Sequence, residues 1–156
     1  MKLKDPSLLR SQAYINGAWI DAADGRVFGV HNPSDGSLIA EVADLGADSV
    51  TAAIDAAVPA QKAWAATTAK TRAMILRRWY DLVIENTNDL ATILTTEMGK
   101  PLAEAKGEIA YGASFIDWFG EEARRVCGDV MESPQADKRL LTFKQPIGVF
   151  GAITPW

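Results

Sequence analysis

Hydrophobic and polar positions change their spacing along this chain. Before Asp48 the apolar runs are short and are separated by turn signals: Asn16-Gly17 interrupts "AYINGAWI", and "NPSDG" divides "RVFGVHN" from "SLIAEV". An Asn-Gly pair readily adopts the positive φ angles that a two-residue hairpin turn requires. The pattern therefore predicts short antiparallel strands in this first part of the chain.

From Asp48 onward the apolar spacing becomes helical. Asp48 is expected to cap a first helix, which Pro59 should kink or divide because proline removes a backbone hydrogen bond. Thr68 is expected to cap a second helix. A break near residues 85–89 and a further stretch of helix ending at Gly99 should follow.

A long apolar stripe follows Pro101, a residue that suits the first position of a helix. Its members recur at spacings of four and three residues and continue to Gly128: Ala105, Ile109, Gly112, Ile116, Phe119, Ala123 and Val126. This spacing predicts one long helix packed against a large neighbour. Gly112 is expected to let that neighbour approach closely.

The last part of the chain predicts two strands of different kinds. "KRLLTFKQ", residues 138–145, alternates and carries charge, which favours an exposed or intersubunit strand. Residues 147–153 are apolar and partly β-branched, as in a strand buried on both faces of a parallel sheet. Ligands of α/β sheets bind beyond the carboxyl ends of such strands, so Thr154, Pro155 and Trp156 are expected at a ligand site. The fold class predicted from these patterns is α/β.

Composition narrows the class of protein. With 156 residues, of which 48% are hydrophobic, the chain is long enough for one globular domain with a core. The net charge of -4 comes without a concentrated basic block, which argues against a nucleic-acid partner. Arg77-Arg78 and Arg124-Arg125 are expected on solvated helix faces. The basic start lacks an apolar signal core and no window approaches membrane-spanning length, so we expect a cytoplasmic protein without a membrane partner.

The sequence pattern alone assigns a chemical role to few residues. Cys127 is the only thiol and His31 the only imidazole, but a catalytic pair is disfavoured because Cys127 falls at a helix end whose dipole opposes a thiolate. No Cys, His or carboxylate cluster has metal-ligand spacing, and no glycine-rich phosphate motif is present. Trp64, Trp79 and Trp118 lie on or beside apolar helix stripes and are expected in the core.

Two longer stretches carry a resemblance to a known family. "EMGKPLAEAKGEIAYGASFIDWFGEEARRVCGD" and "KQPIGVFGAITPW" resemble the N-terminal third of the NAD(P)-dependent aldehyde dehydrogenase superfamily. "YINGAWIDA", "NPSDGSLIAEV" and "AAIDAAVPAQKAW" extend the likeness over almost the whole chain, and "PLAEAKGEI" and "FIDWFGEEARR" are most similar to its succinate-semialdehyde dehydrogenase branch. The resemblance implies part of a cofactor-binding domain in residues 1–127, an oligomerisation-type strand region in 128–146, and the first strand of a Rossmann-like parallel sheet in 147–156.

The function that this resemblance implies is oxidation of an aldehyde, with succinate semialdehyde as the expected substrate, to the carboxylate by NADP or NAD. In the family a cysteine thiolate attacks the aldehyde, an asparagine helps to hold the oxyanion, and a glutamate activates the water that hydrolyses the thioester. Ile153, Thr154, Pro155 and Trp156 match the segment that lies against the cofactor. The catalytic groups follow beyond this point in the family, so the chain is expected to be an N-terminal portion that is inactive by itself.

The resemblance also bears on other residues. Gly107 and Tyr111 match a region near the substrate tunnel, with simple helix packing as the alternative. Cys127 falls away from the family's nucleophile, so it is expected to be structural. Relatives are homodimers or homotetramers, and residues 138–145 match a region used between subunits. Glutarate semialdehyde and other small aldehydes stay open as substrates, and a non-catalytic oligomerisation or scaffold fragment is the alternative function.

Overall fold

The first part of the chain forms two antiparallel hairpins. The computed structural model describes residues 1–154. Its first strands are β1 (Ala13–Ile15) paired with β2 (Ala18–Ile20), and β3 (Val27–His31) paired with β4 (Leu38–Ala43). Asn16 and Gly17 take φ angles of 50° and 83°, the positive values that the tight turn between β1 and β2 needs. The predicted antiparallel strands are confirmed.

Four helices follow, α1 (Ala47–Ala65), α2 (Ala69–Glu85), α3 (Thr87–Met98) and α4 (Leu102–Glu122). Thr68 caps α2 as predicted, because its hydroxyl oxygen accepts a hydrogen bond from the Thr71 N–H at 3.1 Å. Gly99 ends α3 with a left-handed φ of 81°. The prediction that Asp48 caps α1 is wrong, because the helix begins one residue before it. The helix continues through Pro59 and so is not divided there, since loss of one backbone hydrogen bond does not end a helix of this length; the kink stays a prediction.

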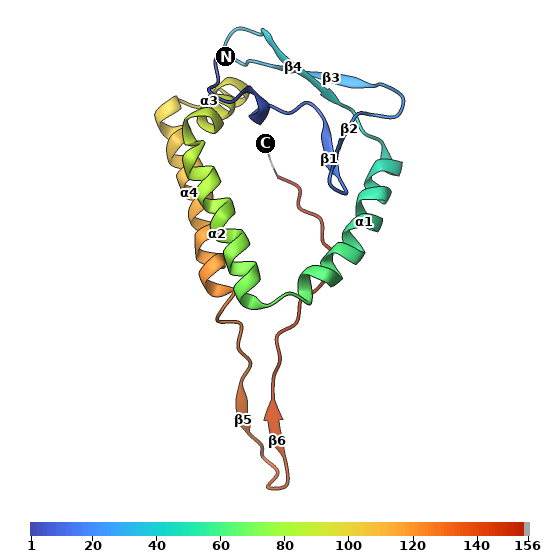
Figure 1. Cartoon of the computed structure of the whole chain (residues 1–156), viewed down its shortest axis with the longest axis vertical. Helices are drawn as coiled ribbons and strands as arrows, with labels where there is room; N and C mark the ends of the chain where they lie inside the picture. The colour runs from blue at the N-terminus through green and yellow to red at the C-terminus, as the bar shows by residue number, and fades with distance from the viewer. Residues whose placement is uncertain (155–156) are drawn as a thin grey trace.

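Small residues form the contact of α4 with its neighbours α2 and α3 (Figure 1). Ala105, Ala113 and Gly120 are buried, and their spacings of eight and seven residues place them on one face. A Cβ at Gly120 would lie 3.5 Å from the Leu76 Cβ, whereas a Cβ at Gly112 would meet nothing within 4 Å. The prediction that Gly112 admits the neighbour is therefore wrong. Gly120 has that role, because it faces Leu76 of α2.

Large aromatic residues lie outside this contact. Trp64, Trp79 and Trp118 are 40%, 55% and 64% exposed, so their predicted place in the core is wrong for the described chain. The physical reason is that the helices meet through alanine and glycine, which bring their backbones close together. The bulky side chains then point away from the contact.

The N-terminal arm, residues 1–10, includes the short 3-10 helix η1 (Pro6–Leu8) and is fastened to α3. The Asp89 carboxylate, 8% exposed, accepts hydrogen bonds from the backbone N–H groups of Lys4 at 3.0 Å and Asp5 at 2.8 Å. Asp89 lies in the first turn of α3, where the helix dipole also favours a negative charge. One side chain therefore joins segments that are 84 and 85 residues apart.

A third hairpin projects from the end of the helical part (Figure 1). It pairs β5 (Val130–Glu132) with β6 (Arg139–Leu141), and every residue of both strands is exposed, as predicted for an exposed strand in residues 138–145. Its base is tight, because a Cβ at Gly128 would lie 1.8 Å from the Thr142 carbonyl oxygen. The Thr142 N–H donates to the Asp129 carbonyl oxygen at 2.9 Å.

Residues 147–153 do not form the strand that their apolar sequence predicts. Ile147 and Ile153 are fully exposed, and Gly148 takes a φ of 121°. An extended backbone becomes a strand only when its N–H and C=O groups pair with a neighbour. None of the six strands within residues 1–154 pairs with this segment. The described chain is thus a mixed α/β unit of three separate hairpins and four helices, without a parallel sheet.

Candidate functional site

The segment that leads to the predicted cofactor residues runs along α1 (Figure 1). Residues 148–151 and α1 line a groove of about 530 Å³, to which α1 contributes Val50, Ile54, Val58 and Gln61. Spacings of four, four and three residues put these side chains on one helix face. Gly148 and Gly151 carry no side chains, which leaves the backbone of the segment accessible along this groove.

The four predicted cofactor residues lie at the end of this segment. Ile153 is fully exposed and Thr154 is exposed as well. Pro155 and Trp156 lie outside the described residues. The structure therefore places Ile153 and Thr154 on an accessible surface beyond the groove, and their contact with a cofactor stays a prediction.

Gly107 and Tyr111, the predicted tunnel residues, lie on an exposed face of α4. A Cβ at Gly107 would meet nothing within 4 Å, and Tyr111 is 66% exposed. Tyr111 packs edge-on against Phe115, with 4.9 Å between the ring centroids. Phe115, Trp118 and Phe119 continue this aromatic face and line a groove of about 350 Å³. Neither predicted residue packs against a neighbouring helix in the described chain, so this face is accessible to a ligand or to another part of a protein.

Cys127 and His31 do not form a catalytic pair. Strand β3, which contains His31, lies at the top of the molecule in Figure 1, whereas α4, which precedes Cys127, ends far below it at the base of the β5–β6 hairpin. Cys127 is exposed. Glu121 and Glu122 form ion pairs with Arg125 at 4.0 and 3.1 Å, an arrangement that is typical of a solvated helix face.

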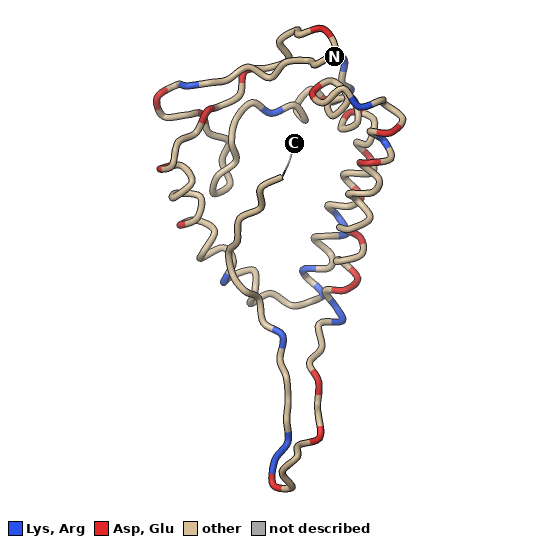
Figure 2. Tube along the Cα trace, turned by 180° about the vertical axis from the view of Figure 1, so that it is seen from behind, with Lys and Arg blue, Asp and Glu red and all other residues tan. Residues whose placement is uncertain are grey.

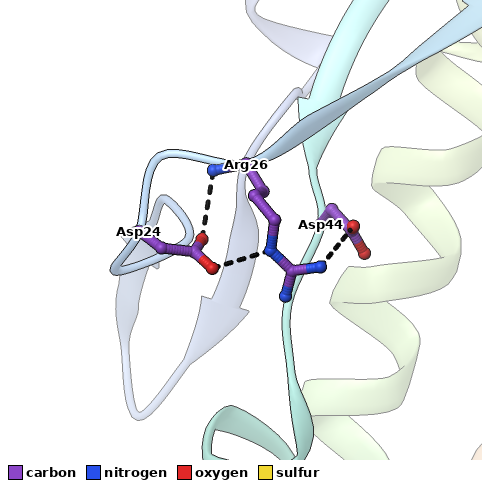
Figure 3. Close-up of polar contacts among 3 residues, drawn as sticks. All are labelled: Asp24, Arg26 and Asp44. Atoms are coloured by element: carbon purple, nitrogen blue, oxygen red, sulfur yellow. Dashed lines mark hydrogen bonds and ion pairs between the residues drawn. The ribbon is translucent and has the colours of Figure 1, made fainter.

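Two exposed carboxylates, Asp24 and Asp44, bind the side chain of Arg26 and so stabilise the loop before β3 (Figure 3). Arg26 Nε donates to Asp24 Oδ2 at 2.7 Å, and Arg26 Nη1 donates to Asp44 Oδ2 at 3.1 Å. The hydrogen bond from the Arg26 side chain lowers the pKa of Asp24, and the same bond raises the pKa of Arg26. None of these residues lines the groove beside α1. Their role is to hold the loop before β3 to the end of β4.

The distribution of charge and of ligating groups limits the chemistry of the described chain. Figure 2 shows acidic and basic positions spread along the trace rather than gathered in one block of either sign. Within residues 1–154 no three His, Cys, Asp or Glu side chains are grouped so that they could hold a metal ion. None of the helices described there is both long and apolar enough to span a bilayer.

Sequence reasoning missed the wall of the groove that α1 supplies. Val50 and Ile54 were recognisable as apolar helix positions, but nothing in their spacing shows that they face residues 148–151. Asp89 was missed as well. The only local signal was an acidic residue in the first turn of a helix, and its partners Lys4 and Asp5 are too distant in sequence for a local rule to find.

Comparison with known proteins assigns the family. The model of the "Aldehyde dehydrogenase family" matches residues 19–156. The chain belongs to the aldehyde dehydrogenase family. The glutarate-semialdehyde dehydrogenase of Pseudomonas aeruginosa is 58% identical to it, and the NADP(+) succinate-semialdehyde dehydrogenase of Escherichia coli is 57% identical. Each match covers 100% of this chain and 32% of the relative, so the chain spans about a third of the length of these family members.

Solved structures of the family agree with the fold. The crystal structure of succinate-semialdehyde dehydrogenase from Burkholderia pseudomallei matches with a TM-score of 0.91 and 56% identity, over 95% of this chain and 31% of that chain. The crystal structure of an Escherichia coli NADP dependent enzyme matches with a TM-score of 0.91 and 55% identity, over 94% of this chain and 30% of that chain. The predicted fold class, the N-terminal part of an aldehyde dehydrogenase-like fold, is confirmed.

Proposed function

We propose that this chain is the N-terminal part of an NAD(P)-dependent aldehyde dehydrogenase that oxidises a small semialdehyde to the carboxylate. The observation that carries the proposal is the 57–58% identity, over all 156 residues, to enzymes named for succinate semialdehyde and glutarate semialdehyde. Both substrates carry a carboxylate at one end and an aldehyde at the other. Succinate semialdehyde is the substrate we propose first, and glutarate semialdehyde is the alternative.

The proposed role of this chain in the reaction is to bind and position. Ile153 and Thr154 fit a cofactor surface, because Ile153 offers an exposed apolar side chain and the backbone before it has no partner strand within residues 1–154. We assign Pro155 and Trp156 to the same cofactor contact. A cofactor held there, NADP or NAD, would supply the acceptor for the substrate's hydride. Gly107 and Tyr111 are proposed to line the substrate's path along the exposed face of α4.

The covalent chemistry requires residues of the longer enzyme. We propose a cysteine thiolate that attacks the aldehyde and a glutamate that activates the water for thioester hydrolysis. We do not assign Cys127 as that nucleophile, because it follows the C-terminal end of α4, where the helix dipole disfavours a thiolate. The chain of residues 1–156 alone is therefore proposed to be inactive, and the cytoplasmic location stays a prediction.

The assay for this proposal follows the reduced nicotinamide by its near-ultraviolet absorbance. The longer enzyme and the 1–156 chain, each with its mass confirmed, are supplied with succinate or glutarate semialdehyde and with NADP or NAD. We expect turnover by the longer enzyme only. Failure of the longer enzyme with both semialdehydes would contradict the proposed reaction. Reduced cofactor formed by the 1–156 chain above a blank would contradict the proposed division of roles.

Assembly into a homodimer or homotetramer is the second part of the proposal. The β5–β6 hairpin supports it, because two exposed strands with open outer edges are suited to pairing with another strand. Replacing residues 130–141 by a short Gly-Ser linker in the longer enzyme should lower its sedimentation coefficient toward that of a smaller assembly. An unchanged coefficient would contradict this role. A scaffold without catalysis, the alternative function, predicts assembly without turnover by the longer enzyme.

A further inference from the structure

A second groove lies where α1, the first turn of α2 and the segment after β6 meet. Its volume is about 450 Å³, within the range of roughly 300–1,000 Å³ that small-molecule sites occupy. Two cationic side chains, Arg72 and Lys144, line it together with an apolar wall of Trp64, Val126 and Pro146. The groove thus combines positive charge and a flat apolar surface.

The positive charge of this groove is not balanced within the described chain. No carboxylate lines the groove, and neither Arg72 nor Lys144 forms an ion pair with any of residues 1–154. Arg72 also lies in the first turn of α2, where the helix dipole adds a partial positive charge.

The Arg72 side chain is held in place before any ligand arrives. Its Nη1 donates to the Thr67 carbonyl oxygen and lies 3.5 Å from the Thr67 hydroxyl oxygen. A guanidinium group has further N–H donors in a rigid plane, and these can meet an oxyanion. The half-buried position of Arg72 limits the screening of its charge by water.

The apolar residues that line the groove suit an apolar body. Trp64 is 40% exposed and Val126 is 60% exposed, so the faces that they show to the groove are accessible. An inorganic anion by itself would leave this wall in contact with water, and a neutral aromatic molecule would leave the two cations without a counter-charge. Only a ligand that has both an anionic group and an apolar body contacts the two cations and the apolar wall together.

We propose that this groove binds a small organic anion. Its carboxylate or phosphate group lies between Arg72 and Lys144, and its flat apolar body packs against Trp64. The site rests on none of residues 153–156 and is additional to the cofactor contact. Carboxylate and phosphate share the chemistry that the two cations recognise, and the choice between them is left to experiment.

Isothermal titration of the 1–156 chain with benzoate, phenyl phosphate, benzyl alcohol and inorganic phosphate tests the site. We expect benzoate or phenyl phosphate to bind at least tenfold more tightly than benzyl alcohol, and more tightly than inorganic phosphate. The tighter of the two identifies the acid group. Binding of the anion should weaken as salt is added. Absence of binding by both aromatic anions, or equal binding of benzyl alcohol, would overturn the proposal.

A pair of matched variants assigns the binding to this groove. Lys144→Gln should lower the affinity for the aromatic anion by roughly tenfold, because it removes one charge-assisted hydrogen bond. Lys138→Gln makes the same charge change in the loop of the β5–β6 hairpin and should leave affinity unchanged. Circular dichroism confirms that both variants keep their helices. An equal loss of affinity in both variants, or no loss in Lys144→Gln, would show that the anion binds elsewhere.

Discussion

Replacing Asp89 by asparagine should loosen the N-terminal arm from α3. The Asp89 carboxylate accepts two backbone hydrogen bonds, at 3.0 Å from Lys4 and 2.8 Å from Asp5. The asparagine amide keeps one acceptor oxygen but turns an NH₂ group toward the second donor. A hydrogen bond to a charged group is worth about 1.5–3 kcal/mol, so losing one and weakening the other should lower the free energy of unfolding by about 2–4 kcal/mol.

Urea denaturation of the 1–156 chain measures the loss, and amide hydrogen exchange locates it. The amides of Lys4 and Asp5 should exchange faster in Asp89→Asn, while those in the middle of α4 should change only as far as global stability falls. Asp48→Asn is the matched control. Asp48 is also acidic in the first turn of a helix, but it makes no side-chain hydrogen bond or ion pair within residues 1–154.

The control separates the hydrogen bonds from the helix dipole. Asp48→Asn should cost only the dipole interaction, about 0.3–1 kcal/mol. Equal losses of stability in the two variants would refute the assignment of the larger effect to the hydrogen bonds of Asp89. Unchanged exchange at Lys4 and Asp5 would refute the idea that Asp89 holds the arm.

Three further predictions concern other parts of the chain. Gly128→Ala should open the base of the β5–β6 hairpin, because its Cβ would lie 1.8 Å from the Thr142 carbonyl oxygen, and an intact hairpin by NMR would contradict this steric reason. Gly112→Ala, whose Cβ would meet nothing within 4 Å, should instead stabilise α4 by about 0.5–1 kcal/mol, as measured by urea denaturation. Cys127→Ser in the longer enzyme should keep turnover within a few fold of the parent, and a folded but inactive variant would show that the thiol is catalytic. The 1–156 chain should self-associate through residues 147–153 more than a 1–146 chain, and sedimentation that finds both equally monodisperse would oppose this.

Local rules account for the parts of the fold that the sequence predicts. Asn16-Gly17 forms a turn because both residues tolerate positive φ, Thr68 caps α2 with its own hydroxyl group, and Gly99 ends α3 in the left-handed region. Each of these signals acts within a few residues of chain. They therefore operate in the same way whatever the rest of the protein does.

The wrong predictions depend on partners that local rules do not reveal. Gly112 and Gly120 are equally small, and only the position of α2 makes Gly120 the contact residue. Trp79 was assigned to the core because apolar spacing indicates a contact face without saying whether a neighbour covers it. The strand expected at residues 147–153 fails for the same reason, since an isolated extended segment has no ladder of hydrogen bonds.

In the candidate site, too, local signals predict some features, and contacts between distant segments decide the others. The family likeness assigned Ile153 and Thr154 to a cofactor contact, which stays a prediction. The groove along residues 148–151, which precede them, is walled by α1, whose residues lie about a hundred positions earlier in the chain. The pairing of Arg72 with Lys144 in a second groove likewise brings together two separate segments. Such sites arise from chain topology, which residue spacing alone does not encode.

The link between Asp89 and the N-terminal arm also sets an order of events during synthesis. The arm is made before its acceptor, which is 84 to 85 residues later in the chain. At about 5–20 residues per second, residues 1–10 wait roughly 4–17 seconds before Asp89 is even polymerised. Throughout that interval the backbone N–H groups of Lys4 and Asp5 are open to water or to a chaperone. Residues 1–10 thus reach these native contacts only after Asp89 has been made.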